Sequence, residues 1–253
     1  MHERIYKSQA VVLRRYDFGE ADKQLVAYTP HLGKISVLAK GVKRTISRKA
    51  GHLEPFTLSH LVIARGRNLD TVTSAQTVEP FALVRTDPDR LFPAMLVAEL
   101  LDKLTLEREP NLALWNLFLE TLRRLEEGLD PWQAATYYQL HLLQLSGYRP
   151  ELARCVECEG PLDPANLHFS PTLGGLLCQA SRSADAMAIR TSANAVKVLR
   201  AALGLPYENF ARIVVGPPVR TEVDALLREN LRRLLDLDPA SHRVIESMRR
   251  QPT

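Results

Sequence analysis

The chain has 253 residues, of which 45% are hydrophobic and 25% are charged, with a formal net charge of +4. This composition is typical of a globular protein with a substantial core and argues against a wholly disordered chain. Its 3 cysteines cannot form a disulfide framework without one left over, so we expect a reducing, cytoplasmic setting. The first residues lack the apolar core of a signal peptide, and no segment approaches about 18 uninterrupted apolar residues, so we expect no membrane span.

Charge is sorted along the chain. Residues 1–80 carry 13 Lys or Arg and 7 Asp or Glu, a balance of +6, whereas residues 81–189 carry 9 and 15, a balance of −6. Residues 190–253 carry 11 and 7, a balance of +4. A basic surface attracts nucleic acid and other polyanions, so the two basic ends favour such a ligand and the acidic middle does not.

The first 80 residues have the pattern of strands separated by turns. Alternating or β-branched apolar residues predict five strands, over residues 9–15, 24–28, 34–38, 57–64 and 69–77. Five short strands without a long helical period suggest a small closed barrel or a sandwich. The five-stranded oligonucleotide-binding (OB) barrel has this size, and an SH3-like barrel would also fit. We expect a nucleic-acid-binding domain over residues 1–80.

The segment 33–51 is the most informative part of the sequence. It contains six Lys or Arg and no Asp or Glu: Lys34, Lys40, Lys43, Arg44, Arg48 and Lys49. Cations without a nearby counter-charge repel one another, and a polyanion such as nucleic acid neutralises them. A solvated basic loop is the alternative. We predict that these six side chains line a groove that follows the phosphate backbone, with Arg14, Arg15 and Lys23 at its edge.

From residue 87 onward the apolar period changes to that of helices. Apolar stripes span residues 91–104 and 112–125, and Asp130 before a proline predicts the N-cap of a third helix. We expect these three helices to form an antiparallel bundle, which a helix capped at Ser192 and a last helix after Pro218 complete. The helical domain then comprises residues 81–148 and 190–253.

Residues 149–189 interrupt the helical pattern and are rich in Pro, Gly and Cys. Cys155 and Cys158 have the Cys-x-x-Cys spacing of a zinc knuckle, and Cys178 follows after 19 intervening residues, as in a zinc ribbon. The position of the expected fourth cysteine holds Ser181, which is a poor zinc ligand. The segment is therefore interpreted as a degenerate zinc-ribbon-like insert.

Three interpretations of this insert stay open. It binds zinc through three cysteines and recruits His168, another side chain or a water molecule. It is a metal-free hairpin with residual thiols. Or its Cys-x-x-Cys is a redox pair. A structural zinc site needs a closed tetrahedron, which weighs against the first, and the sequence before Cys155 predicts no strand, which weighs against the third.

No catalytic motif is present. The sequence lacks a Gly-Lys-Ser/Thr phosphate loop, a Gly-x-Gly-x-x-Gly after a strand, His-Glu-x-x-His and Gly-x-Ser-x-Gly. Its 7 histidines are scattered along the chain. The sequence therefore predicts a protein that is not an enzyme and has no organic cofactor, with zinc as its one candidate metal.

An ordered series of short motifs resembles the RecO family of bacterial DNA recombination mediators. The resemblance covers roughly residues 8–182. Its motifs are Arg15-Tyr16-Asp17-Phe18-Gly19-Glu20-Ala21-Asp22, Gly33-Lys34, Ala39-Lys40-Gly41, Ser47-Arg48, Leu53-Glu54-Pro55-Phe56, Gly66-Arg67-Asn68-Leu69, Ala98-Glu99-Leu100, Gly147-Tyr148-Arg149-Pro150-Glu151-Leu152, Cys155-x-x-Cys158, Phe169-Ser170 and Gly174-Gly175-Leu176-Leu177-Cys178.

The resemblance implies a fold and a function. The fold is an N-terminal OB barrel, a helical domain and a zinc-ribbon-like insert that usually has four cysteines, from which Ser181 departs. The implied protein is cytoplasmic and nucleoid-associated, and it acts in recombinational DNA repair without catalysis. It binds single- and double-stranded DNA, anneals complementary strands, and works with RecR to load the recombinase RecA onto DNA coated by single-strand-binding protein.

Two other functions compete with this one. The acidic helical middle could bind a protein partner, so that the chain is an adaptor with only weak affinity for nucleic acid. Alternatively, the barrel could be an RNA-binding module, because composition does not distinguish RNA from DNA.

Overall fold

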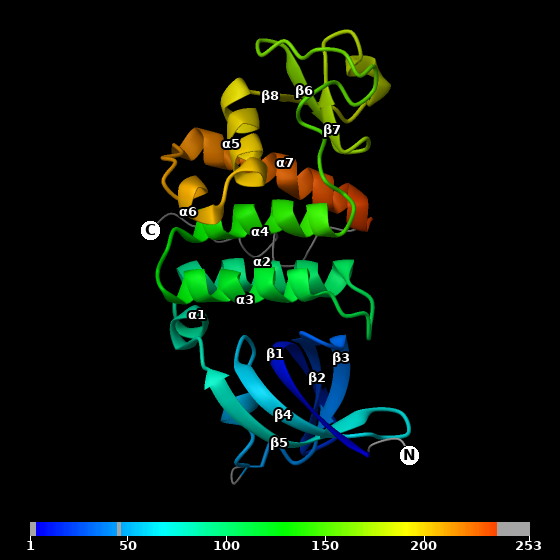
Figure 1. Cartoon of the computed structure of the whole chain (residues 1–253), viewed down its shortest axis with the longest axis vertical. Coiled ribbons are helices and arrows are strands. Elements are labelled where there is room, and N and C mark those ends of the chain that lie inside the picture. The colour runs from blue at the N-terminus through cyan, green and yellow to red at the C-terminus, as the bar shows by residue number, and fades with distance from the viewer. Residues whose placement is uncertain (1–3, 45–46, 237–253) are drawn as a thin grey trace. The chain divides into compact units, whose positions relative to one another are not determined.

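The computed structural model describes residues 4–44 and 47–236, and Figure 1 traces the chain. Its internal contacts divide it into two compact units, Met1–Leu129 and Asp130–Thr253. This division falls later than the boundary predicted near residue 80, and helices lie in both units. The end of the predicted helical domain, residues 237–253, lies outside the described part. Across the described residues, no helix combines the length and apolar character needed to cross a membrane.

Five strands form the sheet of the first unit. They are β1 (Ile5–Phe18), β2 (Asp22–Thr29), β3 (Gly33–Ala39), β4 (Leu58–Ala64) and β5 (Asp70–Glu79). Four antiparallel pairings and one short parallel pairing, between β3 and β5, close the sheet into a barrel in the order β1-β2-β3-β5-β4. The five predicted strands are confirmed. β1 extends beyond both predicted ends because it pairs with β4 along its first half and with β2 along its second.

Side-chain alternation along these strands builds the barrel core. Every second residue points inward, and the buried cluster includes Ala10, Val12, Leu25, Ala27, Ile35, Val37, Leu61, Ile63 and Val72. Val42 and Leu53 belong to the same cluster although they lie in the segment between β3 and β4. These two side chains therefore anchor that connecting segment to the barrel.

The other side of β2 and β3 is also covered. Val26 and Tyr28 alternate with the core residues of β2, so they point away from the barrel interior, yet both are buried. The cover comes from α2 (Pro88–Leu104) and the residues that follow it, since Lys34 bonds to Asp102 and the backbone N–H of Arg108 donates to the Lys34 carbonyl at 2.8 Å. This side of the sheet is closed by the protein itself.

The first unit also contains α1 (Ala82–Thr86) and α3 (Leu112–Glu126). The Asn111 side chain accepts a hydrogen bond from the backbone N–H of Leu114 and so caps α3, and Asp87 caps α2 in the same way. The helices predicted over residues 91–104 and 112–125 are confirmed. Leu112 was placed in an apolar stripe but is exposed, because it occupies the first turn of its helix, where no neighbour covers it.

The second unit combines helices with a small sheet. Its helices are α4 (Pro131–Leu145), α5 (Ala193–Gly204), α6 (Tyr207–Phe210) and α7 (Pro217–Leu235). The sheet has the order β7-β6-β8 and is built from β6 (Leu167–Ser170), β7 (Gly175–Leu177) and β8 (Ile189–Thr191). The predicted caps are confirmed: Asp130 accepts from two backbone N–H groups at the start of α4, and Ser192 from one at the start of α5.

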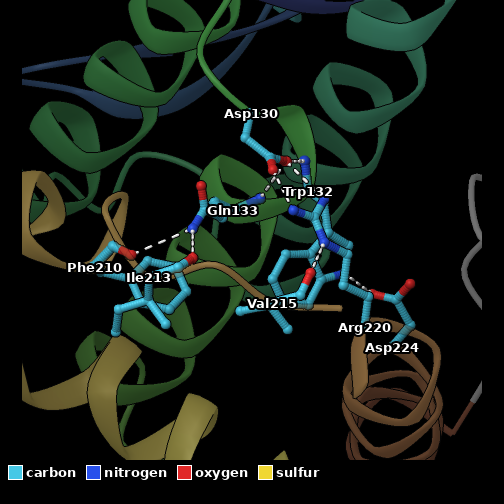
Figure 2. A network of polar contacts seen from close by, with 8 residues as sticks. All are labelled: Asp130, Trp132, Gln133, Phe210, Ile213, Val215, Arg220 and Asp224. Atoms are coloured by element: carbon cyan, nitrogen blue, oxygen red, sulfur yellow. Dashed lines mark hydrogen bonds and ion pairs between the residues drawn. The ribbon is translucent and has the colours of Figure 1, made fainter. Parts of the chain in front are cut away.

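A polar network fixes the start of α4 to α7 (Figure 2). The Arg220 guanidinium donates to both carboxylate oxygens of Asp130, at 2.5 and 3.1 Å, and lies over the Trp132 ring at 4.7 Å. The Trp132 indole N–H donates to Asp224 at 2.8 Å. The buried Gln133 amide donates to the carbonyls of Phe210 and Ile213 and so holds the segment between α6 and α7. Asp130 is thus a helix cap and a tertiary anchor.

Candidate nucleic-acid interface and metal site

The basic loop, described over residues 40–44 and 47–50, begins beside the turn between β1 and β2. The backbone N–H of Gly41 donates to the Asp22 carboxylate at 2.7 Å, and the backbone N–H of Lys43 donates to the Ala21 carbonyl at 3.0 Å. Val42 belongs to the barrel core, so its side chain anchors the loop to the barrel. The loop and the turn therefore form one rim of the barrel, which we call the basic rim (residues 16–23, 40–44 and 47–50).

Three of the predicted cations are exposed on this rim. Lys40, Arg44 and Arg48 make no ion pair or side-chain hydrogen bond within residues 4–44 and 47–236. Their charges are therefore compensated only by solvent and salt. We therefore keep these three side chains as the candidates for contact with a polyanion.

Lys23 and Lys43 also lie on the rim, but they share a carboxylate. Their ammonium groups approach the two Asp17 oxygens at 3.1 and 3.0 Å. Hydrogen bonds from Lys43 and then Lys23 lower the pKa of Asp17, which keeps it ionised. Because Asp17 itself is exposed, these are solvent-screened ion pairs that a phosphate group can compete for. The prediction that Lys43 lacks a counter-charge is wrong.

Lys34 and Arg14 are paired with an acidic residue of α2. The Arg14 guanidinium and the Lys34 ammonium both reach the buried carboxylate of Asp102 in α2. The Lys34 ammonium lies 3.1 Å from that carboxylate and also donates to the Asp102 carbonyl at 2.5 Å. Lys34 was expected to repel its basic neighbours, but its charge is neutralised by a residue 68 positions away. No local sequence pattern indicates an ion-pair partner at that sequence separation.

The two remaining cations have intramolecular partners. Arg15 donates to the Glu54 carboxylate at 2.6 Å, and the Lys49 ammonium donates to the Val72 carbonyl at 3.0 Å. These contacts tie β1 and the basic loop to neighbouring segments of the barrel. The nine predicted side chains therefore divide into an exposed set on the rim and a set held by the fold.

Two exposed aromatic rings accompany the exposed cations. Tyr16 and Phe18 stand two residues apart on β1, so they share one side of the strand, and they are 44% and 47% exposed. The Arg14 guanidinium lies over the Tyr16 ring, 5.4 Å from its centre. Tyr28, a third aromatic of the same region, is fully buried, and burial raises its pKa to about 12. The rim thus offers two rings for base stacking.

Sequence reasoning missed two further exposed cations, Arg65 and Arg67, in the turn between β4 and β5. Gly66 between them is required, because a Cβ atom there would lie 1.9 Å from the Leu69 carbonyl oxygen. Asp70 holds this turn by accepting from the Gly66 N–H and the Tyr6 hydroxyl. OB barrels bind ligands with the β1–β2 and β4–β5 loops together. This rule could have pointed to Arg65 and Arg67 from the sequence.

The three cysteines meet in the second unit. The Sγ atoms of Cys155, Cys158 and Cys178 lie within 4.8 Å of one another, and those of Cys158 and Cys178 are 3.8 Å apart. Burial raises the pKa of Cys155, but backbone N–H groups of Cys158 and Cys178 donate to its sulfur and lower the pKa to about 6 overall. The prediction from spacing that these thiols converge is confirmed, and the cluster could hold a metal ion.

His168 does not join the cluster. It lies on β6, opposite Leu177 of β7, and no ring nitrogen of His168 belongs to the group of close ligand atoms found in the described residues. Burial, followed by the charges of Arg182 and Arg190, lowers its pKa. His168 is therefore a buried sheet residue, and the prediction that it could complete a metal site is wrong in this geometry.

Taken together, the two units define a protein with a five-stranded N-terminal barrel, a helical remainder and a cysteine cluster. The family model "Recombination protein O N terminal" matches residues 1–81, and "Recombination protein O C terminal" matches residues 85–243. The chain therefore belongs to the RecO family, as the sequence motifs predicted.

Individual relatives agree with the family models. A protein of Roseiflexus sp. named "DNA repair protein RecO" is 39% identical over 249 residues, which is 98% of this chain and 88% of the relative. Proteins of the same name from Pelotomaculum thermopropionicum and Dehalococcoides mccartyi are 36% and 35% identical, each over 96% of its own length. The similarity thus extends along the whole chain and is not confined to one unit.

Proposed function

We propose that this protein is a non-catalytic mediator of recombinational DNA repair that binds DNA through the basic rim. The observation that carries the proposal is that the basic rim holds both uncompensated Lys40, Arg44 and Arg48 and exposed Tyr16 and Phe18, in a chain of a DNA repair family. The closed five-stranded sheet supports assignment of the barrel as an OB fold. Cations bind phosphates of any sequence, so the affinity does not depend on base identity.

The geometry suggests how strands are annealed. Phosphates on the rim are neutralised by the exposed cations, which removes part of the repulsion between two approaching strands. The rim carries two aromatic rings, so most bases of a bound strand stay free to pair. In the proposed pathway the protein acts with RecR on DNA coated by single-strand-binding protein. Together they help load RecA onto that DNA.

Charge reversal of the exposed cations tests the proposal. The triple variant Lys40→Glu, Arg44→Glu and Arg48→Glu removes three candidate phosphate contacts while leaving the Asp102 and Glu54 ion pairs intact. For single-stranded DNA, three lost contacts reduce the slope of log K against log salt by about 2. Fluorescence anisotropy with a labelled oligonucleotide at several salt concentrations measures both the affinity and this slope.

A matched control carries the same charge change in the second unit. The exposed residues Arg190, Lys197 and Arg212 provide it as a second triple Glu variant, which is expected to bind DNA nearly as the parent does. Equal losses in the two variants point to net charge alone and contradict a localised rim. Unchanged binding in the first variant favours the adaptor function, and an annealing assay on DNA coated with single-strand-binding protein then shows whether mediation persists.

A further inference from the structure

Asp17 bridges two cations of the basic rim from the solvent side. One of its carboxylate oxygens lies 3.1 Å from the Lys23 ammonium, and the other lies 3.0 Å from the Lys43 ammonium. The Asp17 side chain is 69% exposed, whereas the side chains of Lys23 and Lys43 are each 26% exposed. The two cations are therefore the covered partners of this cluster, and the anion is the partner that solvent reaches most easily.

The opposite arrangement occurs at Asp102. Its carboxylate also bridges two cations, Arg14 and Lys34, but its side chain is only 6% exposed. An anion from solvent cannot replace a buried carboxylate unless the fold opens. It can replace Asp17, because an exposed side chain leaves its partners by rotating into solvent.

The main chain holds the two lysines in place independently of the Asp17 carboxylate. Lys23 is a residue of β2, which is paired with β1 on one side and with β3 on the other. The Lys43 backbone N–H donates to the Ala21 carbonyl at 3.0 Å, and the Lys43 ammonium donates to the Gly19 carbonyl at 3.3 Å. The two ammonium groups therefore stay close together when Asp17 turns away.

A phosphodiester resembles the Asp17 carboxylate in its hydrogen-bonding chemistry. Each presents two oxygen atoms that share one negative charge and accept charge-assisted hydrogen bonds from ammonium groups. A DNA strand on the basic rim also offers phosphates to Lys40 and Arg44, whereas Asp17 offers a single carboxylate. A bound strand can therefore replace Asp17 while its neighbouring phosphates stay in contact with the rest of the rim.

We propose, on the basis of the proposed DNA-binding function of the basic rim, that Asp17 occupies the position of a DNA phosphate in the free protein and is displaced when DNA binds. Asp17 then competes with DNA for Lys23 and Lys43 and lowers the affinity of the rim. A weakened hold suits a protein whose proposed role ends with transfer of the DNA to another protein.

Asp17→Asn tests the proposal, because it keeps the size of the side chain and removes the competing charge. Exposed ion pairs are weak, so we expect the variant to bind single-stranded DNA about fivefold more tightly at low salt. The gain should shrink as salt rises, since salt already screens the Asp17 ion pairs of the parent. Fluorescence anisotropy with a labelled oligonucleotide at several salt concentrations measures both effects.

A double-mutant cycle shows whether Asp17 acts through the two lysines. In the background Lys23→Gln and Lys43→Gln, Asp17→Asn should change the DNA affinity by less than about twofold, because the cations that Asp17 covers are absent. An undiminished gain in this background would mean that Asp17 repels DNA as a general negative charge, and it overturns the proposal.

Glu20→Gln is the matched control. Glu20 is an exposed carboxylate in the same turn, and across the described residues its side chain makes no ion pair or hydrogen bond. Its substitution should raise the DNA affinity by less than about twofold, and a gain equal to that of Asp17→Asn overturns the proposal. Rim-dependent binding by the parent without a gain in Asp17→Asn overturns this inference alone. Failure of both proteins to bind DNA overturns the proposed function as well.

Discussion

At the scale of single residues, Asp102 decides which cations are available to a ligand. Its carboxylate is buried and receives both Arg14 and Lys34, and the Lys34 side chain is itself only 15% exposed. A buried ion pair adds little to stability in itself, but removal of one partner leaves an uncompensated charge in the interior. Asp102 therefore holds β1 and β3 against α2.

We expect Asp102→Asn to lower the free energy of unfolding by about 3 kcal/mol, because Lys34 then stays buried without a counter-charge. Urea denaturation monitored by circular dichroism measures the change. Asp17→Asn is the control, since Asp17 also bridges two cations but is exposed, and it should leave stability nearly unchanged. Equal effects of the two substitutions would show that the buried position of Asp102 is unimportant.

At the scale of elements, the β1–β2 hairpin brings aromatic and basic groups to one rim. Tyr16 and Phe18 are exposed on β1, and Lys40 and Arg44 follow β3, which pairs with β2 up to Ala39. A stacked base contributes about 1–3 kcal/mol, whereas paired bases in a duplex are not free to stack on protein side chains. Under the proposed function, we therefore expect the hairpin to favour single strands over duplex.

The double variant Tyr16→Ala and Phe18→Ala should bind a single-stranded oligonucleotide about tenfold more weakly, with a much smaller change for duplex of the same length. Anisotropy titrations with both DNAs measure the two affinities. Tyr148→Ala removes an aromatic ring of similar exposure from the second unit and serves as the control. Parallel losses for single strand and duplex would argue that the rings support the fold of the rim and do not stack on bases.

The sequence predicted regular elements better than the partners of side chains. Strands of the barrel and the longer helices follow from apolar periodicity, and the caps at Asp130 and Ser192 follow from local chemistry. The short helices α1 and α6 were not predicted, because four or five residues carry no measurable period. Pairing of Lys34 with Asp102 depends on tertiary packing, which one sequence does not disclose.

The cysteine insert shows the same limit. Spacing alone predicted that Cys155, Cys158 and Cys178 converge, because the Cys-x-x-Cys turn and the return of a hairpin fix their separation. The third strand, β8, and the placement of His168 within the sheet did not follow from spacing. The three-dimensional arrangement was needed to place His168 outside the cysteine cluster.

At the scale of the whole molecule, each compact unit contains one of the 2 tryptophans. Trp115 lies in α3 of the first unit, and Trp132 lies in α4 of the second, where Arg220 stacks on it. Variants with a single tryptophan, Trp132→Phe and Trp115→Phe, therefore report separately on the two units. The cysteine cluster belongs to the second unit and is linked to its helices through Arg200, which bonds the Leu152 carbonyl.

Cys155→Ser introduces a hydroxyl at a fully buried sulfur and weakens any metal site, so it should destabilise the second unit by about 2 kcal/mol or more. In the Trp115→Phe background, the midpoint temperature of unfolding reported by Trp132 fluorescence should fall. In the Trp132→Phe background, the midpoint temperature reported by Trp115 should not change. DNA affinity, measured below both transitions, should be unchanged because the basic rim lies in the first unit. A common shift of both fluorescence transitions would mean that the two units unfold as one cooperative body, and loss of DNA binding would place part of the interface in the second unit.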